Sequence, residues 1–243
     1  NATPLSALAL MELAVRAGFP PGLMNIVTGR TAQIGAELTG NPTVRKVTFT
    51  GSTPVGKQLI AECAETVKRT SMELGGNAPF IVFDDADIDA AVQGTLASKY
   101  RNAGQTCVCS NRIIVQAGIY DEFVSKLTVA TEKLVIGDGT EEGVTVGPLI
   151  DEKAANTVCD FIDDAVAKGA KVALGGGRSD LGGFFVLPTI LTDVSRDMRV
   201  FSEEIFGPVA PIFKFETEAE VVEMANDTEF GLAAYFYSRD IGR

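Results

Sequence analysis

Short apolar runs alternate along the chain with longer segments whose apolar positions recur every three or four residues. The first spacing is typical of buried strands and the second of amphipathic helices. Thr3 is expected to cap the first helix. The pattern predicts helices over residues 5–16, 32–38, 55–66, 87–99, 120–135, 152–168 and 219–226, strands over 25–27, 46–50, 70–74, 80–83, 112–116 and 233–237, and short strands near Lys171, Phe184 and Val209.

This alternation predicts an α/β fold with parallel strands, divided into two modules. Residues 1–76 show the rhythm of a Rossmann-type nucleotide fold, and residues 77–243 form a second α/β module. The first strand and crossover of a complete nucleotide fold are missing, and the chain stops at Arg243 without a finishing element. We therefore expect a fragment that holds the C-terminal part of a cofactor domain and a truncated second domain.

Composition narrows the classes of function. With 243 residues, 46% of them hydrophobic, the chain can bury a substantial core. A net charge of -11 argues against a nucleic-acid partner, which would need patches of Lys and Arg. The sequence shows neither an apolar run long enough for a membrane span nor a signal peptide. We expect no membrane partner and a cytoplasmic location, or the mitochondrial matrix in a eukaryote.

The absence of histidine restricts the chemistry further. Without His, this chain cannot hold a Ser-His-Asp triad, a Cys-His dyad or an imidazole metal ligand. The four cysteines lack the paired spacing of zinc sites, so no metal is expected. Any general base in the chain must be a carboxylate or a lysine.

Two motifs of the first module could bind a ligand. Gly51 and Ser52 stand where a strand turns into a helix, and backbone N–H groups at such a position can hold a pyrophosphate. An ordinary N-cap and tight turn is the open alternative. Glu73 ends an apolar strand beside Gly75 and Gly76, which let another backbone or a ligand approach closely. A lone Glu there can simply be solvated, but without His it is a general-base candidate.

Two further motifs lie in the second module. Small and polar residues surround Cys107, which suits an accessible nucleophile. Cys63 and Cys159 instead fall in helical stretches with apolar neighbours, as packed thiols do. Glu204 and Phe206 precede an apolar strand, and taken alone their segment fits a loop with a buried Phe206.

The whole chain resembles the aldehyde dehydrogenase superfamily, because four motifs occur in that family's order and spacing: Phe49-Thr50-Gly51-Ser52, Met72-Glu73-Leu74-Gly75-Gly76, Gly104-Gln105-Thr106-Cys107 and Glu204-Ile205-Phe206-Gly207-Pro208. The resemblance implies an aldehyde dehydrogenase-like α/β fold, with a partial Rossmann-type cofactor domain followed by a catalytic domain. It implies Cys107 as the nucleophile and Glu73 as the general base. It also implies NAD or NADP as the cofactor, bound by six residues: Gly29, Gly51, Ser52, Leu74, Glu204 and Phe206.

The same resemblance assigns parts of the cofactor and steps of the reaction. Glu204 would bind the nicotinamide ribose, Phe206 would pack near the nicotinamide, and the Gly51 turn would hold the pyrophosphate. The Cys107 thiolate would add to the aldehyde, and the thiohemiacetal would lose hydride to the nicotinamide. Water activated by Glu73 would then hydrolyse the thioester.

Residues 99–112 are similar to the succinate-semialdehyde dehydrogenase branch of the family. In that branch the arginine at this position, which is Arg101 here, is expected to bind the substrate carboxylate, since a guanidinium can donate two parallel hydrogen bonds to a carboxylate. A surface Arg in a solvated salt bridge is the open alternative. The other enzyme readings are a glutarate-semialdehyde dehydrogenase and a general aldehyde dehydrogenase.

Several expectations remain beside the main one. Cys109 could be a resolving thiol that protects Cys107 under oxidation, or a small buried residue. The family's oxyanion-hole Asn and its Lys-Pro-x-Glu segment are expected upstream of Asn1, and its oligomerising strand beyond Arg243. We therefore expect these 243 residues to be inactive alone and the full-length protein to be a homo-oligomer, a dimer or a tetramer. An inactive cofactor-binding or structural fragment is the alternative outside the enzyme class.

Overall fold

A computed structural model describes residues 2–243, and the chain divides into two compact units. The first unit ends at Leu74 and the second runs from Gly75 to Arg243. The division lies two residues before the boundary expected at residue 76. No helix of residues 2–243 has both the length and the apolar character needed to cross a membrane.

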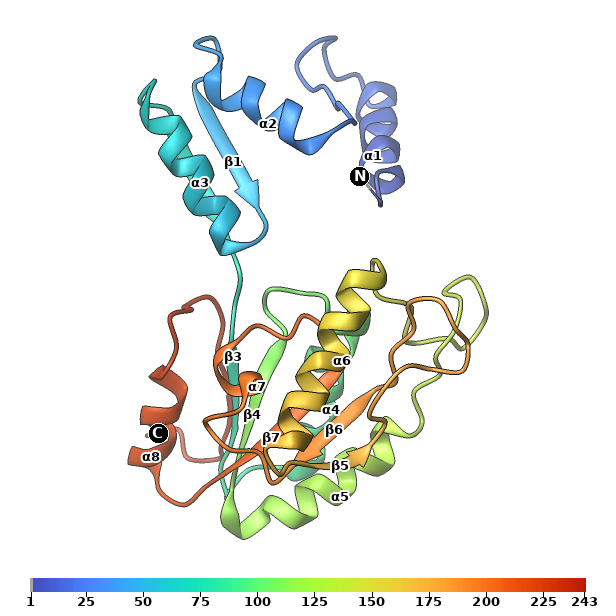
Figure 1. Cartoon of the computed structure of the whole chain (residues 1–243), viewed down its shortest axis with the longest axis vertical. Helices are drawn as coiled ribbons and strands as arrows, with labels where there is room; N and C mark the ends of the chain where they lie inside the picture. Colours follow the sequence, from blue (N-terminus) through green and yellow to red (C-terminus); the bar gives the residue numbers. More distant parts are fainter. Residues whose placement is uncertain (1) are drawn as a thin grey trace. The chain divides into compact units, whose positions relative to one another are not determined.

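The first unit contains a β-α-β crossover, of which β1 and α3 are labelled in Figure 1. Its two strands are parallel, with Thr50 beside Glu73, and α3 packs against both of them. The elements of this unit are α1 (Leu5–Arg16), α2 (Thr31–Gly40), β1 (Lys46–Thr50), α3 (Thr53–Ala64) and β2 (Arg69–Glu73).

Two local predictions for the first unit are wrong. The first helix has the predicted bounds, but Pro4, not Thr3, is its N-cap residue, and no side chain caps it. Residues 25–27 form no strand, and Val27 is 73% exposed. Such a short apolar run needs a neighbouring strand to satisfy its backbone, and no strand of the described chain pairs with it.

The second unit is built on a six-stranded sheet with the order β5-β6-β7-β4-β3-β8. All neighbours are parallel except β5 and β6. The strands are β3 (Ala78–Val82), β4 (Ser110–Gln116), β5 (Lys171–Leu174), β6 (Thr189–Thr192), β7 (Val209–Phe215) and β8 (Tyr235–Tyr237). The predicted strand near Phe184 is wrong, because Gly182 and Gly183 turn the chain there with positive φ angles, and β6 was not predicted.

Helices cover both faces of this sheet. They are α4 (Ile88–Lys99), α5 (Tyr120–Thr131), α6 (Glu152–Ala167), the short α7 (Arg199–Ser202) and α8 (Glu218–Asn226), with 3-10 turns η1 (Arg101–Gly104) and η2 (Ala117–Ile119). Along β4, Ile113 and Val115 join the core that contains residues of α4 and α5, whereas Ile114 joins the core that contains residues of α6, α7 and α8. This alternation is the pleat of a strand buried on both sides.

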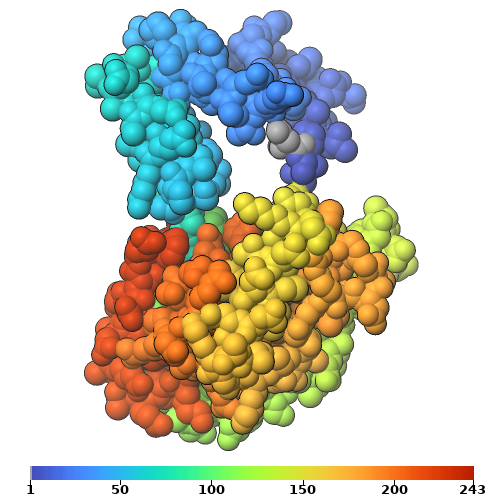
Figure 2. All heavy atoms as spheres, in the orientation of Figure 1, coloured from blue at the N-terminus to red at the C-terminus, as the bar shows by residue number. Residues whose placement is uncertain are grey.

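Helix α6 shows how one helix joins that core. Its buried residues recur at helical spacing, whereas its other face is open to solvent and forms the yellow ridge of Figure 2. Asp151 caps it by accepting a hydrogen bond from the Ala154 N–H at 2.8 Å. Helix α5 ends at Thr131, four residues earlier than predicted, because the backbone at Val135 and Ile136 pairs with residues 145–146 instead.

Candidate functional site

In the first unit, the turn between β1 and α3 presents Gly51 and Ser52 to solvent. The Gly51 N–H donates to the carbonyl of Glu73 at 3.0 Å, which ties the turn to the end of β2. Ser52 is the N-cap residue of α3, but its side chain makes no capping hydrogen bond. Ser52 therefore occupies the N-cap position, as the ordinary interpretation expects, but its hydroxyl does not cap the helix. The start of this twelve-residue helix can accept an anion.

A cavity of about 660 Å³ lies between α2, β1 and α3. Its lining is mostly apolar and includes Gly29, Ile34, Leu38, Phe49, Val55 and Leu59. This volume is within the range of small-molecule sites, roughly 300–1,000 Å³. Gly29, expected among the cofactor residues, thus lines the same hollow as Val55, which lies in the first turn of α3.

Glu73 and Leu74 close the first unit. The Glu73 side chain is exposed at the end of β2, where a carboxylate can reach a ligand or water. The Leu74 side chain packs on α3, since a Cβ built on Gly56 would lie 2.5 Å from Leu74 Cδ2. Both residues are therefore connected to the Gly51 turn, Glu73 through its carbonyl and Leu74 through α3.

In the second unit, Cys107 lies in a tightly constrained loop before β4. Asn102, Ala103 and Gly104 have φ angles of 53°, 54° and 76°, a run in the left-handed region that is unusual for residues other than glycine. A Cβ on Gly104 would collide with the carbonyl of Gly207. One residue past Cys107, the Tyr235 hydroxyl donates to the Val108 carbonyl at 2.8 Å.

Gly76 lies against the backbone of Cys107. It is buried, and a Cβ at this position would collide with the Cys107 carbonyl oxygen. The expectation that this glycine pair admits a close backbone is thereby confirmed. The Cys107 side chain remains partly exposed, and its backbone N–H makes no hydrogen bond with a described residue.

Glu204 lies on the other side of Gly76. Its carboxylate accepts a hydrogen bond from the Gly76 N–H at 3.0 Å, and a Cβ on Gly75 would lie 2.6 Å from Glu204 Oε2. Partial burial raises the pKa of Glu204, while the Gly76 N–H and the charge of Lys99 act against that rise. The structure thus gathers Gly76, Cys107 and Glu204, three members of separate sequence motifs.

The ring of Phe206 is not buried, although its segment taken alone fits a loop with a buried ring. Its side chain is 45% exposed, and its φ of 52° is rare for a bulky residue. The next residue, Gly207, fits only without a side chain, because a Cβ there would collide with Val158 of α6. An exposed aromatic ring on a strained, tightly packed loop suits contact with a ligand.

The remaining candidates differ in accessibility. Arg101 is exposed and forms no ion pair with any residue from 2 to 243, so the salt-bridge alternative finds no partner there. Cys109 is 6% exposed, with its thiol 3.7 Å from the carbonyls of Lys99 and Ser110, as a packed residue would be. Cys63 is buried as predicted, and partly buried Cys159 packs on the core, where burial raises the pKa of its thiol.

Sequence reasoning missed a buried polar cluster beside these residues. Asn77, Asn111 and Arg112 are each at most 3% exposed and are linked by hydrogen bonds. Lys99 is also fully buried, and its ammonium has no hydrogen-bond partner among the described residues. The available signal was the polar start of β4, Ser110-Asn111-Arg112, in front of an apolar run.

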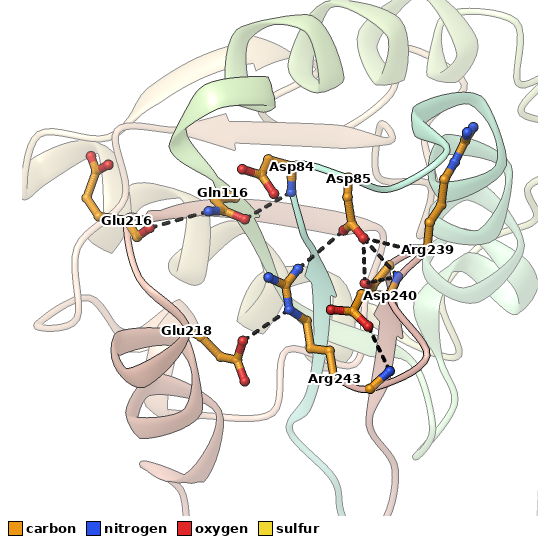
Figure 3. A network of polar contacts seen from close by, with 10 residues as sticks. Asp84, Asp85, Gln116, Glu216, Glu218, Arg239, Asp240 and Arg243 are labelled. Atoms are coloured by element: carbon orange, nitrogen blue, oxygen red, sulfur yellow. Dashed lines mark hydrogen bonds and ion pairs between the residues drawn. The ribbon is translucent and has the colours of Figure 1, made fainter.

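These residues lie at the edge of the sheet where parallel strands begin, since Gly76, Cys107 and Glu204 precede β3, β4 and β7. The opposite edge is closed by polar contacts around Asp85 (Figure 3). The Asp85 carboxylate accepts from the Ser238 hydroxyl and the Arg239 N–H, both at 2.9 Å. The three candidate residues where the strands begin therefore do not follow the rule that sites lie at the carboxyl ends of strands, which favoured Glu73 as a candidate.

Comparison with known proteins finds similarity along the whole chain. Residues 1–243 match the model of the aldehyde dehydrogenase family. A 3-sulfolactaldehyde dehydrogenase of Pseudomonas putida is 64% identical, a glutarate-semialdehyde dehydrogenase of Pseudomonas aeruginosa 63%, and an NADP-dependent succinate-semialdehyde dehydrogenase of Escherichia coli 61%. Each alignment covers 99% of this chain and 50% of the relative, so the chain spans about half the length of the curated relatives it matches.

Solved structures agree with the family match. A crystal structure of succinate-semialdehyde dehydrogenase from Burkholderia pseudomallei is 60% identical, with a TM-score of 0.97 over 99% of this chain and 50% of that chain. Lactaldehyde dehydrogenase from Escherichia coli is 40% identical, with a TM-score of 0.94 over the same shares. The predicted α/β aldehyde dehydrogenase-like fold is confirmed.

Proposed function

The chain belongs to the aldehyde dehydrogenase family, and from this premise we propose that it supplies the thiol nucleophile and much of the cofactor site of an enzyme that oxidises a semialdehyde to the acid. The substrate proposed first is succinate semialdehyde, and the cofactor is NAD or NADP. One observation carries the proposal: the backbone of Gly76 contacts the Cys107 loop, while its N–H binds the carboxylate of Glu204. The proposed nucleophile loop and the proposed cofactor carboxylate thus both contact the same glycine.

The residues present suit a nicotinamide dinucleotide. The open N-terminus of α3 at Gly51 and Ser52 matches a pyrophosphate, and the neighbouring apolar cavity matches a purine ring. Glu204 can accept hydrogen bonds from ribose hydroxyls, and exposed Phe206 can contact the nicotinamide. When bound, the dinucleotide supplies the acceptor for the hydride that leaves the substrate carbon.

Cys107 would perform the covalent step. Its thiolate adds to the aldehyde carbon and forms a thiohemiacetal, whose oxyanion needs a hydrogen-bond donor. The Cys107 N–H, unpaired among the described residues, can donate to this oxygen. Loss of hydride leaves a thioester on Cys107.

Glu73 would complete the turnover. Its exposed carboxylate can take a proton from water, which then attacks the thioester and releases the acid and the free thiol. No His is available for this task in the chain. The carbonyl of Glu73 is already occupied by Gly51, so the strand end is fixed while the side chain stays free.

Arg101 would select the substrate. The substrates named for the three relatives are 3-sulfolactaldehyde, glutarate semialdehyde and succinate semialdehyde, each of which joins an aldehyde to an anionic group. An exposed arginine without an ion-pair partner in residues 2–243, six positions before the nucleophile, fits such an anion. Glutarate semialdehyde is therefore the alternative substrate, and an uncharged aldehyde is disfavoured.

The decisive experiment compares initial rates of the full-length gene product with succinate semialdehyde, glutarate semialdehyde and propanal, each with NAD and with NADP. We expect the highest kcat/KM for succinate semialdehyde and the lowest for propanal. Equal kcat/KM values for all three would reject the substrate proposal. An absence of NAD(P)H formation by the full-length gene product with every aldehyde would reject the enzymatic proposal and favour a cofactor-binding or structural role without catalysis.

Assembly and surroundings are proposed in the same way. The relatives are enzymes about twice as long, and we propose that the full-length protein is a dimer or tetramer located in the cytoplasm, or in mitochondria if the source is a eukaryote. The net charge of -11 supports the absence of a nucleic-acid partner. Size-exclusion chromatography with light scattering measures the oligomeric state directly.

A further inference from the structure

The side chain of Asn111 grips the backbone on both sides of Glu204. Its Nδ2 donates to the Glu203 carbonyl at 2.8 Å, and its Oδ1 accepts from the Ile205 N–H at 3.0 Å. Asn111 is 2% exposed and lies in β4, four residues after Cys107. One buried amide therefore fixes the two peptide groups that flank the Glu204 carboxylate.

The same amide also holds the donor that Glu204 uses. Asn111 Nδ2 donates to Asn77 Oδ1 at 2.6 Å, and Asn77 follows Gly76, whose N–H binds the Glu204 carboxylate. Both Nδ2 hydrogens of Asn111 are thus used, and its oxygen is used once. The carboxylate and its hydrogen-bond donor are anchored to one side chain.

Arg112 in turn holds the backbone of Asn77 by hydrogen bonds. Arg112 donates to the Asn77 carbonyl from Nε at 3.2 Å and from Nη2 at 3.0 Å. Its other contacts reach the carbonyls of Met224 at 2.6 Å and Ala225 at 2.9 Å. A buried network of this kind favours one conformation, because a loosened member would leave unpaired polar groups.

We infer that Asn111 is a positioning residue of the cofactor site, which orients Glu204 toward the nicotinamide ribose. The inference rests on the proposed cofactor role of Glu204 and goes beyond it. An amide is needed at this position, since the neighbours include two acceptors and one donor. A carboxylate of the same shape could not donate, and an aliphatic side chain could do neither.

The alternative is that Asn111 only stabilises the core. The two roles separate when ligands that contain or lack the nicotinamide ribose are compared. ADP carries the adenosine and pyrophosphate alone, ADP-ribose adds the ribose, and NADH adds the nicotinamide. A loss of core stability without reorientation of Glu204 would not distinguish ADP from ADP-ribose.

The experiment measures Kd for ADP, ADP-ribose and NADH in the full-length gene product and its Asn111→Asp variant, or for their 2'-phosphorylated forms if NADP is preferred. We expect Kd to rise about tenfold or more for ADP-ribose and NADH, and to stay unchanged for ADP. Equal changes for all three ligands, or no change, would overturn the inference. Absence of NADH and NADPH binding by the parent would instead reject the proposed function.

Two controls complete the design. Thr95→Val removes a fully buried hydroxyl that bonds to the Ala91 carbonyl of its own helix and to none of the residues 203–205, and it should leave all three Kd values unchanged. In a Glu204→Ala background, Asn111→Asp should cause no further loss for ADP-ribose, because the residue acts through Glu204. Should Asn111→Asp fail to fold, Asn111→Ser replaces it, since a hydroxyl cannot span the same three groups, with the same expected and contradicting results.

Discussion

The backbone N–H of Gly76 donates a hydrogen bond to the Glu204 carboxylate at 3.0 Å, although 128 residues separate the two in sequence. On its other side Gly76 contacts the Cys107 carbonyl, where a side chain would collide. The loop of Cys107, the proposed nucleophile, and the loop of Glu204, the proposed cofactor ligand, therefore share one glycine. A change at this residue should disturb both at once.

Gly76→Ala tests this shared contact. The added methyl must displace the Cys107 carbonyl, so we expect a loss of about 1–3 kcal/mol in the free energy of unfolding, as for other overpacked sites. Urea unfolding measures the loss, and aldehyde oxidation should fall in parallel. Gly118→Ala is the matched control, because no atom lies within 4 Å of its added Cβ, and its effect should stay within about 0.5 kcal/mol. Equal unfolding midpoints for the two variants would contradict the prediction.

Glu204→Gln should separate stability from cofactor binding. Since burial raises the pKa of Glu204 above the ordinary value of 4.5, the folded state holds this proton more tightly than the unfolded state. Stability from Glu204 is present below pH 4.5 and lost as pH rises through the raised pKa. The Gln variant should therefore be more stable than the parent at neutral pH, with the difference vanishing in acid. Chemical unfolding at both ends of this pH range gives the comparison.

The same variant should bind the cofactor more weakly. A neutral amide accepts ribose hydrogen bonds less strongly than a carboxylate, by a factor of roughly ten for one charge-assisted bond. Titration with NAD(P)H in the full-length gene product measures the change. A Gln variant that binds the cofactor as tightly as the parent, or is less stable at neutral pH, would argue against the proposed state of Glu204.

The spacing of apolar residues predicted most of this fold, because most helices and strands bury apolar side chains at regular intervals or in one unbroken run. Strand β1 has the predicted bounds, and β4 and β7 have unbroken apolar runs within them. Strand β6 was not predicted, because its four residues begin and end with threonine and so contain only a two-residue apolar run. Thr189 is fully buried, and its hydroxyl is satisfied by the Gly176 N–H at 2.9 Å and the Leu187 carbonyl at 2.8 Å. Such compensation depends on tertiary contacts that no local pattern displays.

The candidate site could likewise be predicted only as far as local sequence motifs reach. Cys107, Glu73 and Glu204 stand in motifs that a sequence displays, and the structure places Gly76 between Cys107 and Glu204. Asn111 was missed because a polar residue at the start of a strand usually faces solvent. Its partners Asn77 and Glu203 lie 34 and 92 residues away, so the cluster exists only once the sheet has formed.

Arg101→Ala should change which aldehydes are used. Removing the guanidinium takes away charge-assisted hydrogen bonds to an anionic substrate, a loss of about 1.5–3 kcal/mol or roughly 10–150-fold in kcat/KM. Propanal, which carries no anion, should be oxidised as before. Arg239→Ala is the matched control, because Arg239 is exposed at the opposite edge of the sheet, beside Asp85. A uniform decrease for charged and uncharged aldehydes would show that Arg101 acts on folding rather than on substrate choice.

Cysteine labelling should distinguish Cys107 from the other three thiols. Cys63 and Cys109 are 1% and 6% exposed, and burial raises the pKa of Cys159, so each of the three should react more slowly than partly exposed Cys107. A brief exposure of the native protein to iodoacetamide, followed by peptide mass spectrometry, should find Cys107 modified first. Cys107→Ala should remove this fast phase, and denaturation should make the remaining thiols react alike. Faster modification of Cys159 than of Cys107 would count against Cys107 as the nucleophile.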